Sequence, residues 1–101
     1  MNMRNKEPIA IYYARLMKNG RIIIPEGTRS FLKLKEGDQV ELKVKPAEDD
    51  VSALFISNVG KRGLVVIPKH IRERLSLKPG SWLEVTLLAI YRPIIRAEGS
   101  V

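Results

Sequence analysis

One residue pattern occurs twice in this chain, and the repeat constrains the possible fold more than any other feature. A shift of about 43 positions aligns the two copies without a gap. The identical pairs are Lys18/Lys61, Gly20/Gly63, Ile24/Ile67, Pro25/Pro68, Arg29/Arg72, Leu32/Leu75, Leu34/Leu77, Lys35/Lys78, Gly37/Gly80 and Glu41/Glu84. Glycine, proline and arginine recurring in one frame indicate an internal duplication.

The length of the chain predicts that the two copies share one core. Half of a 101-residue chain is too short to bury a sufficient apolar core alone. We therefore expect a single domain over residues 1–101, made of two repeats at about 8–46 and 51–96. The acidic segment 46–50 is expected to connect them.

The composition narrows the classes of protein to consider. With 45% hydrophobic and 29% charged residues, the chain is typical of globular proteins. No apolar run is long enough to span a bilayer and no secretory segment is evident, so we expect a cytoplasmic location and no membrane partner. The absence of cysteine and the single histidine leave little material for a metal site or a nucleophilic triad. We expect no cofactor, no metal and no enzymatic activity.

The local patterns predict a mainly β protein with two short helices. Asn19-Gly20 and Gly60 to Gly63 are typical of tight turns, and each Ile-Pro step predicts a helix start. The uniformly apolar Ile22-Ile23-Ile24 predicts a strand buried on both faces, and the following helix is expected to place Phe31 with Thr28 and Leu32 on one side. The expected strands are 8–17, 22–24, 39–45, 51–59, 64–67 and 82–91, with a short edge strand at 94–96, and the expected helices are 26–32 and 68–75.

Net charge is +7 with a pI of about 10.0, and this excess has two interpretations. It is either a solvated basic surface or the footprint of a polyanionic partner, most often nucleic acid. Residues 1–50 carry a net charge of +2 and residues 51–101 a net charge of +5, so the second half of the sequence holds most of the excess.

The repeated motif resembles the AbrB/SpoVT swapped-hairpin DNA-binding family. It is carried by Gly20-Arg21-Ile22-Ile23-Ile24-Pro25, Arg29, Gly37-Asp38 and the alternating strand that ends at Val44. Family members are usually homodimers with interleaved hairpins, so the resemblance implies a β-barrel formed by two repeats in one chain, similar in plan to the tandem MraZ-type proteins. The spacing leaves room for only one strand between Asp50 and Gly60, so we expect merged or shortened strands at this seam.

The resemblance implies that basic residues on the hairpin loops and helix starts contact double-stranded DNA. The second repeat has Leu64 where the first has Arg21, and its loop residues Lys61 and Arg62 are candidates to replace the lost charge. Arginine can bind phosphates or place a bidentate fork on guanine, and we expect phosphate contacts to dominate. The candidate DNA-binding residues are Arg15, Lys18, Arg21, Arg29, Lys61, Arg62, Arg72 and Arg74.

Structural roles remain open for several of these positions. Arg29 and Arg72 are also candidates for ion pairs across the barrel with Glu41 or Glu84. The tyrosines Tyr12 and Tyr13 are expected in the core or at its rim rather than on bases, Trp82 is expected to pack, and His70 is expected to be solvated. Arg74 replaces the apolar Phe31 of the first repeat, which suggests that one side of the barrel is open or contacts another molecule.

Two functions therefore follow as hypotheses. The first is a DNA-binding transcriptional regulator or nucleoid-associated factor. The second is a protein-interaction module of antitoxin type that neutralises a partner protein. RNA binding, and association of these pseudo-dimers through exposed edge strands, also stay open.

Overall fold

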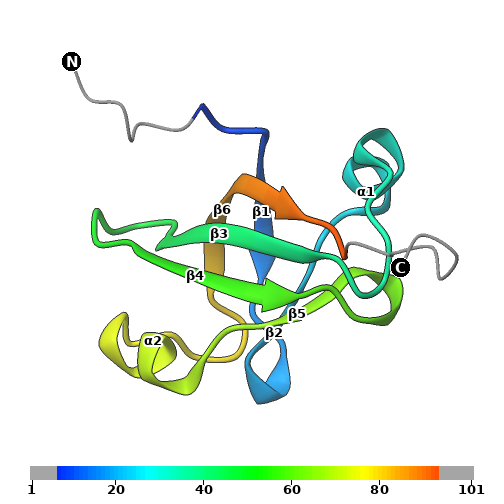
Figure 1. Cartoon of the computed structure of the whole chain (residues 1–101). Coiled ribbons are helices and arrows are strands. Elements are labelled where there is room, and N and C mark those ends of the chain that lie inside the picture. Colours follow the sequence, from blue (N-terminus) through cyan, green and yellow to red (C-terminus); the bar gives the residue numbers. More distant parts are fainter. Residues whose placement is uncertain (1–6, 94–101) are drawn as a thin grey trace, which may run out of the picture.

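The computed structural model describes residues 7–93, and these residues form a mainly antiparallel β fold with two short helices (Figure 1). The expected edge strand at 94–96 lies outside them. In chain order the elements are β1 (Ala10–Arg15), the 3-10 turn η1 (Lys18–Gly20), β2 (Arg21–Ile23), α1 (Glu26–Leu32), β3 (Gln39–Pro46), β4 (Ala53–Asn58), the 3-10 turn η2 (Lys61–Gly63), β5 (Leu64–Val66), α2 (Lys69–Arg74) and β6 (Trp82–Tyr91).

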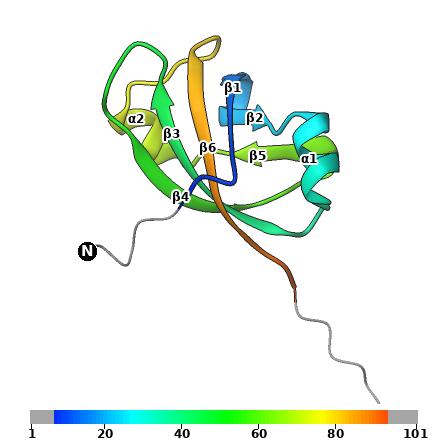
Figure 2. The same cartoon turned by 90° about the horizontal axis from the view of Figure 1, so that it is seen from above.

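The hairpin strands pair with the other repeat rather than with each other. One sheet has the order β1-β6-β3-β4, and a second consists of β2 and β5 alone. Thus β1 and β2 flank the η1 turn, but β1 pairs with β6 and β2 pairs with β5. This exchange of partners is the swapped-hairpin arrangement that the sequence resemblance implies. The β2–β5 pair forms a short ribbon beside the four-stranded sheet (Figure 2).

The strand register repeats with the offset seen in the sequence. Ala10 pairs with Leu87 and Ala53 pairs with Val44, so the β1–β6 and β3–β4 ladders are equivalent. Two pairs relate equivalent residues to each other, Ile22 with Val65 and Lys43 with Thr86, and therefore lie on the pseudo-twofold axis. The symmetry is broken where β6 carries one extra residue, Leu88, between the partners of Glu41 and Leu42.

The strands at the seam were expected to be merged or shortened, but they are not merged, and β4 has the same 6 residues as its equivalent β1. Both β3 and β4 are present as separate antiparallel strands, paired from Gln39 with Asn58 to Val44 with Ala53. The last strand of the first repeat and the first strand of the second form a hairpin across residues 47–52. One strand between Asp50 and Gly60 is sufficient because the other strand of this hairpin, β3, already ends at Pro46.

The core is shared by the two repeats. The fully buried side chains come from β3, β6, and the strands β2 and β5 with the residue that follows each of these two, namely Ile22, Ile24, Val40, Leu42, Val44, Val65, Ile67, Leu83, Val85 and Leu87. Ile23 was expected to be buried with its neighbours, but it is 40% exposed. The ribbon is only two strands wide and has one face on the core, so alternate residues of β2 face outward.

The two helices differ in how deeply they pack. In α2, Ile71 is buried, whereas α1 has no fully buried residue and its half-buried residues are Thr28, Arg29 and Leu32. The expectation that Phe31 packs beside them is wrong, because its side chain is 83% exposed. Phe31 follows Arg29 by two positions, which is a rotation of about 200° on an α-helix. Its side chain therefore lies on the opposite side of the helix from Arg29 and points to solvent.

Arg92, which the sequence patterns did not single out, ties the end of β6 to the first repeat. Its guanidinium donates hydrogen bonds to the carbonyl oxygens of Leu32 and Lys33 at 2.8 and 3.2 Å, at the C-terminal end of α1. It also lies 3.4 Å from the buried carboxylate of Asp38, which accepts a bond from the Lys35 amide. In the second repeat the hydroxyl of Ser81 accepts the equivalent bond from the Lys78 amide.

Burial in the fold disfavours ionisation of the Tyr12 phenol. The Tyr12 hydroxyl has no hydrogen-bond partner among the described residues, and burial raises the pKa of Tyr12 well above its ordinary value of 10.0. The unfolded chain therefore loses this proton at a lower pH than the folded chain does. The stability contributed by neutral Tyr12 is complete below about pH 10 and falls as the pH rises above it.

Tyr12→Phe is expected to lessen this alkaline loss. Urea unfolding at neutral pH and at about pH 11 should show a smaller fall for the variant than for the wild type. At neutral pH the variant should be equally stable or more stable by about 1 kcal/mol, since it removes a buried hydroxyl without a protein partner. The exposed Tyr13 supplies the control, because Tyr13→Phe leaves the buried phenol in place. An unchanged alkaline loss in Tyr12→Phe would contradict the prediction.

Candidate nucleic-acid interface

The two hairpin turns have the same backbone shape but different residues at the tip. In η1, Asn19 and Gly20 have φ angles of 65° and 73°; in η2, Arg62 and Gly63 have φ angles of 59° and 79°. Asparagine and glycine tolerate this left-handed conformation, whereas an arginine there costs roughly 1–2 kcal/mol. A strained basic residue at an exposed loop tip is consistent with a functional role rather than a folding role.

Each turn lies against the helix of the other repeat. The Ile67 amide donates to the Gly20 carbonyl at 2.8 Å, and the Ile24 amide donates to the Gly63 carbonyl at 2.9 Å. These bonds place η1 beside the start of α2 and η2 beside the start of α1. Figures 1 and 2 show the two helices on opposite sides of the molecule, flanking the β2–β5 ribbon. The arrangement follows from the antiparallel pairing of β2 with β5, which brings the beginning of one strand to the end of the other.

Arg29 and Arg72 hold these contacts together. The Arg29 Nε donates to the Ile24 carbonyl at 2.9 Å, and the Arg72 Nε donates to the Ile67 carbonyl at 3.0 Å. Each half-buried side chain also packs directly over the glycine of the opposite turn, Arg29 over Gly63 and Arg72 over Gly20. The two arginines therefore act as positioning residues for the turns. This structural role differs from the ion pairs across the barrel that the sequence left open.

The basic side chains gather in two clusters, one at each end of the ribbon. The η1–α2 cluster consists of Lys18, Arg21, Lys69 and Arg72, and the η2–α1 cluster consists of Lys61, Arg62 and Arg29. All but the two positioning arginines are exposed. Sequence reasoning missed Lys69, although it precedes Arg72 by three residues and so lies on a neighbouring position of the same helix flank.

The net charge of each half of the sequence does not give the net charge of each basic cluster. Each cluster takes its turn from one repeat and its helix from the other, so the excess in residues 51–101 is divided between the two. The position of Lys69 is occupied by Glu26 in the first repeat, which makes the η2–α1 cluster the less positive one. Lys69 itself is 4.0 Å from the Glu73 carboxylate in an exposed pair, a contact worth little in water.

Two predicted residues lie outside the clusters. Arg74 is exposed on α2, two positions and therefore about 200° around the helix from Arg72, so it points away from η1. Arg15 is exposed at the end of β1, with its guanidinium 5.9 Å from the centre of the Trp82 ring. Trp82 was expected to pack, but it is 54% exposed.

The outward face of the ribbon lies between the two clusters. It carries Arg21 and the partly exposed Ile23 from β2, and Leu64 and the half-exposed Val66 from β5. A two-stranded β-ribbon fits the width of the DNA major groove. Within residues 7–93, no group of three or more histidine, aspartate or glutamate side chains could hold a metal ion, and no helix is long and apolar enough to cross a membrane.

Comparison with known proteins places the chain among relatives of this fold. The structure resembles that of PHS018 from Pyrococcus horikoshii, known from a solution structure, with a TM-score of 0.81 and 38% sequence identity over 88% of this chain and 99% of that chain. The chain belongs to the PHS018 family. Residues 56–90 also match the family of MazE antitoxins, described as antidote-toxin recognition MazE. No curated protein gives a significant match.

These matches confirm the resemblance at a coarse level. The MazE match covers most of the second repeat, which the sequence patterns had assigned to the same superfamily of swapped hairpins. PHS018 matches nearly the whole described chain, so this family member shares both repeats rather than one. The fold class predicted from the sequence is confirmed, whereas the individual DNA-binding residues stay predictions.

Proposed function

We propose that this member of the PHS018 family binds double-stranded DNA as a transcriptional regulator or nucleoid-associated factor in the cytoplasm, and that it acts by binding rather than by catalysis. The observation that carries the proposal is the pair of basic clusters at the two ends of the β2–β5 ribbon. A pseudo-twofold axis passes through the ribbon at Ile22 and Val65. A duplex has its own local twofold axes, so a protein surface with this symmetry can present equivalent loops to both strands.

In the proposed mode the ribbon faces the groove and the turns contact phosphates on either side. Lys18 and Arg21 contact the phosphates of one DNA strand, and Lys61 and Arg62 contact those of the other. Arg29 and Arg72 keep the turns in place through the bonds to Ile24 and Ile67. Affinity in this mode comes mainly from phosphate neutralisation and depends strongly on salt.

The test replaces a basic residue of one repeat by the residue that the other repeat has at the equivalent position. Arg21→Leu introduces the residue found at the equivalent Leu64, and Arg62→Asn introduces the residue of Asn19. Binding of a fluorescent random-sequence duplex is measured at several salt concentrations. Each variant is expected to bind more weakly and to lower the slope of log affinity against log salt by about 0.9 if one phosphate contact is lost.

Two features of this design separate binding from folding. Arg62→Asn relieves the left-handed strain, so it should stabilise the fold by about 1 kcal/mol while it weakens binding. Lys43→Thr removes one exposed positive charge from the middle of the four-stranded sheet, replacing it with the residue of the equivalent Thr86, and should leave the salt slope unchanged. Equal losses in all three variants would show only a general charge effect, and no duplex binding at low salt would overturn the proposal.

A second candidate function is an antitoxin-type module that binds a partner protein. It is favoured by the match of residues 56–90 to the MazE antitoxin family and by large apolar side chains that face outward. Phe31 on α1 is 83% exposed, and Leu54 and Ile56 are more than half exposed on the edge strand β4. A folded protein that fails to bind any duplex, yet forms a complex sensitive to Leu54→Ser, would favour this function over DNA binding.

A further inference from the structure

Trp82 lines a pocket that takes no part in the proposed duplex contacts. It is the first residue of β6, with Arg15 of the neighbouring strand β1 on one side. On the β3 side lies a pocket of about 270 Å³, lined by Pro46, Ala47, Glu48, Gly80 and Trp82. Large aromatic rings left in contact with water are enriched at binding surfaces.

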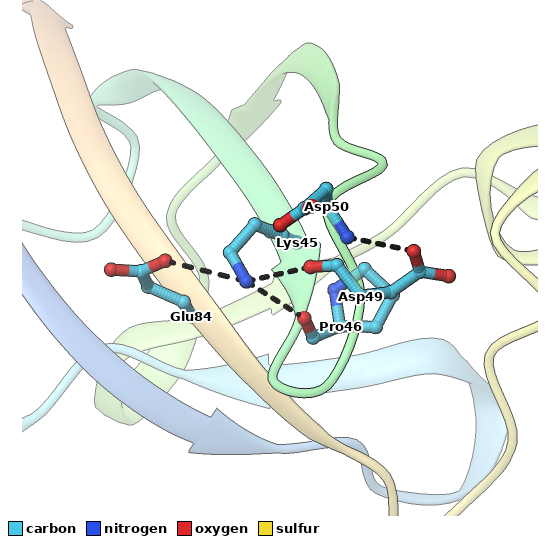
Figure 3. Close-up of polar contacts among 5 residues, drawn as sticks. All are labelled: Lys45, Pro46, Asp49, Asp50 and Glu84. Atoms are coloured by element: carbon cyan, nitrogen blue, oxygen red, sulfur yellow. Dashed lines mark hydrogen bonds and ion pairs between the residues drawn. The ribbon is translucent and has the colours of Figure 1, made fainter.

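The wall of this pocket is held in place by the fold. The Ala47 amide donates to the Trp82 carbonyl at 2.9 Å, which fixes the turn after β3 beside the indole. Figure 3 shows how the Lys45 ammonium closes that turn: it donates to the carbonyl oxygens of Pro46 and Asp49 at 3.1 and 2.7 Å and lies 3.9 Å from the Glu84 carboxylate. A turn tied in this way needs little reordering when a ligand enters.

The chemistry of the pocket fits a flat, neutral ring. The indole offers a stacking surface, and Glu48 is one of the lining residues. A carboxylate repels a phosphate but accepts hydrogen bonds from an amino group. Arg15 has no ion pair with another described residue, and it stands three positions before Lys18 of the η1–α2 cluster. The Leu16 amide and carbonyl bond to Ser81 and Gly80 at 2.8 and 2.7 Å, so this strand end and the pocket rim form one surface.

We propose that this pocket binds an unpaired, amino-bearing nucleobase of single-stranded DNA, stacked on Trp82, while Arg15 and the η1–α2 cluster contact the adjoining phosphates. The inference rests on the proposed DNA-binding function and extends it to strands whose bases are not paired. Bases within a duplex are stacked on each other and cannot enter the pocket. Stacking on aromatic side chains is the usual source of affinity for single strands.

The pseudo-symmetric position, formed by one residue of each repeat, provides an internal comparison. Gln39 occupies the position of Trp82, and Asn58 occupies that of Arg15, so the stacking pair exists once in the described residues. Trp82→Gln therefore removes the ring but retains a residue that the fold already accepts there. Trp82→Phe keeps an aromatic surface and should preserve most of the binding.

The test uses the fact that Trp82 is the only tryptophan of the chain. Addition of a short cytosine oligodeoxynucleotide should change the intrinsic fluorescence of Trp82, and a thymine oligonucleotide should bind more weakly because it lacks the amino group. Anisotropy of the labelled cytosine strand should show about tenfold weaker binding to Trp82→Gln, with recovery in Trp82→Phe. Glu48→Gln should reduce the preference for cytosine over thymine. Circular dichroism checks that each variant is folded.

The outcomes distinguish this inference from the proposed function. If the duplex binds and responds to Arg62→Asn, while cytosine strands bind wild type and Trp82→Gln equally or leave the fluorescence unchanged at saturation, the pocket proposal is wrong and duplex binding stands. If neither duplex nor single strand binds at low salt, both proposals fail. A cytosine oligoribonucleotide that binds more tightly than the DNA strand would overturn the assignment to DNA and point to RNA.

Discussion

Gly63→Ala is expected to destabilise the fold by about 3 kcal/mol, the sum of backbone strain and a lost hydrogen bond. Gly63 has a φ of +79°, and a Cβ there would lie 2.5 Å from the Arg29 Nε and 2.8 Å from the Ile24 carbonyl oxygen. The methyl group would displace the guanidinium from that carbonyl and push η2 away from α1. Urea denaturation followed by circular dichroism measures the loss.

Gly37→Ala is the control that isolates the backbone term. Gly37 has a φ of +98°, but a Cβ at this position meets nothing within 4 Å. It should therefore cost only the strain, roughly 1–2 kcal/mol. The contact term can be checked further with the double variant Gly63→Ala and Arg29→Ala. Its loss of stability should be smaller than the sum of the losses in the two single variants. Equal costs for Gly63→Ala and Gly37→Ala would contradict the positioning role of Arg29.

Leu42→Ala is expected to cost about 3 kcal/mol and to unfold both repeats together. Leu42 is fully buried in β3, where it pairs with Leu87 of β6 and Phe55 of β4. Its removal leaves a cavity between strands of different repeats, and a small domain has only about 5–15 kcal/mol of stability to lose. Trp82 fluorescence reports on the second repeat, whereas circular dichroism reports on the whole chain.

With one shared core, the two probes should give coincident urea transitions, shifted to the same lower midpoint with an unchanged slope. Lys43→Thr serves as a neighbouring control, because Lys43 is exposed on the other face of the same strand. A Trp82 transition that stays at the wild-type midpoint, while circular dichroism shows two steps, would mean that the repeats unfold independently.

The sequence-based predictions agree most closely with the structure where local signals are strong. The Ile-Pro step that ends an apolar run predicts each helix start, and α1 begins and ends at the predicted residues. The strand expected at 82–91 matches β6 at both ends. Candidate basic residues in the turns were also found from the sequence, because glycine and asparagine mark tight turns and charged tips are solvated.

Sequence patterns could not give the surroundings of the candidate site. That α2 lies beside η1 depends on the pairing of Arg21 with Val66, two residues far apart in the chain. The same long-range pairing assigns Arg29 and Arg72 to the backbone of Ile24 and Ile67 and leaves Arg74 outside the clusters. The exposure of Ile23, Phe31 and Trp82 follows from which face each strand or helix turns to the core, which a run of apolar residues does not specify.

The sequence alone determined that this chain contains two copies of one motif and an excess of positive charge, and the resemblance of that motif to the swapped-hairpin family implied the fold. The spacing of glycine, proline and arginine specifies turns and helix starts through interactions within a few residues. These local signals are present in both copies. Only the tertiary structure decided that each turn is held by the helix of the other repeat, and that Arg15 and Trp82 form a separate surface. These features arise from strand pairing between distant segments, where backbone hydrogen bonds and burial of a common core select the partners.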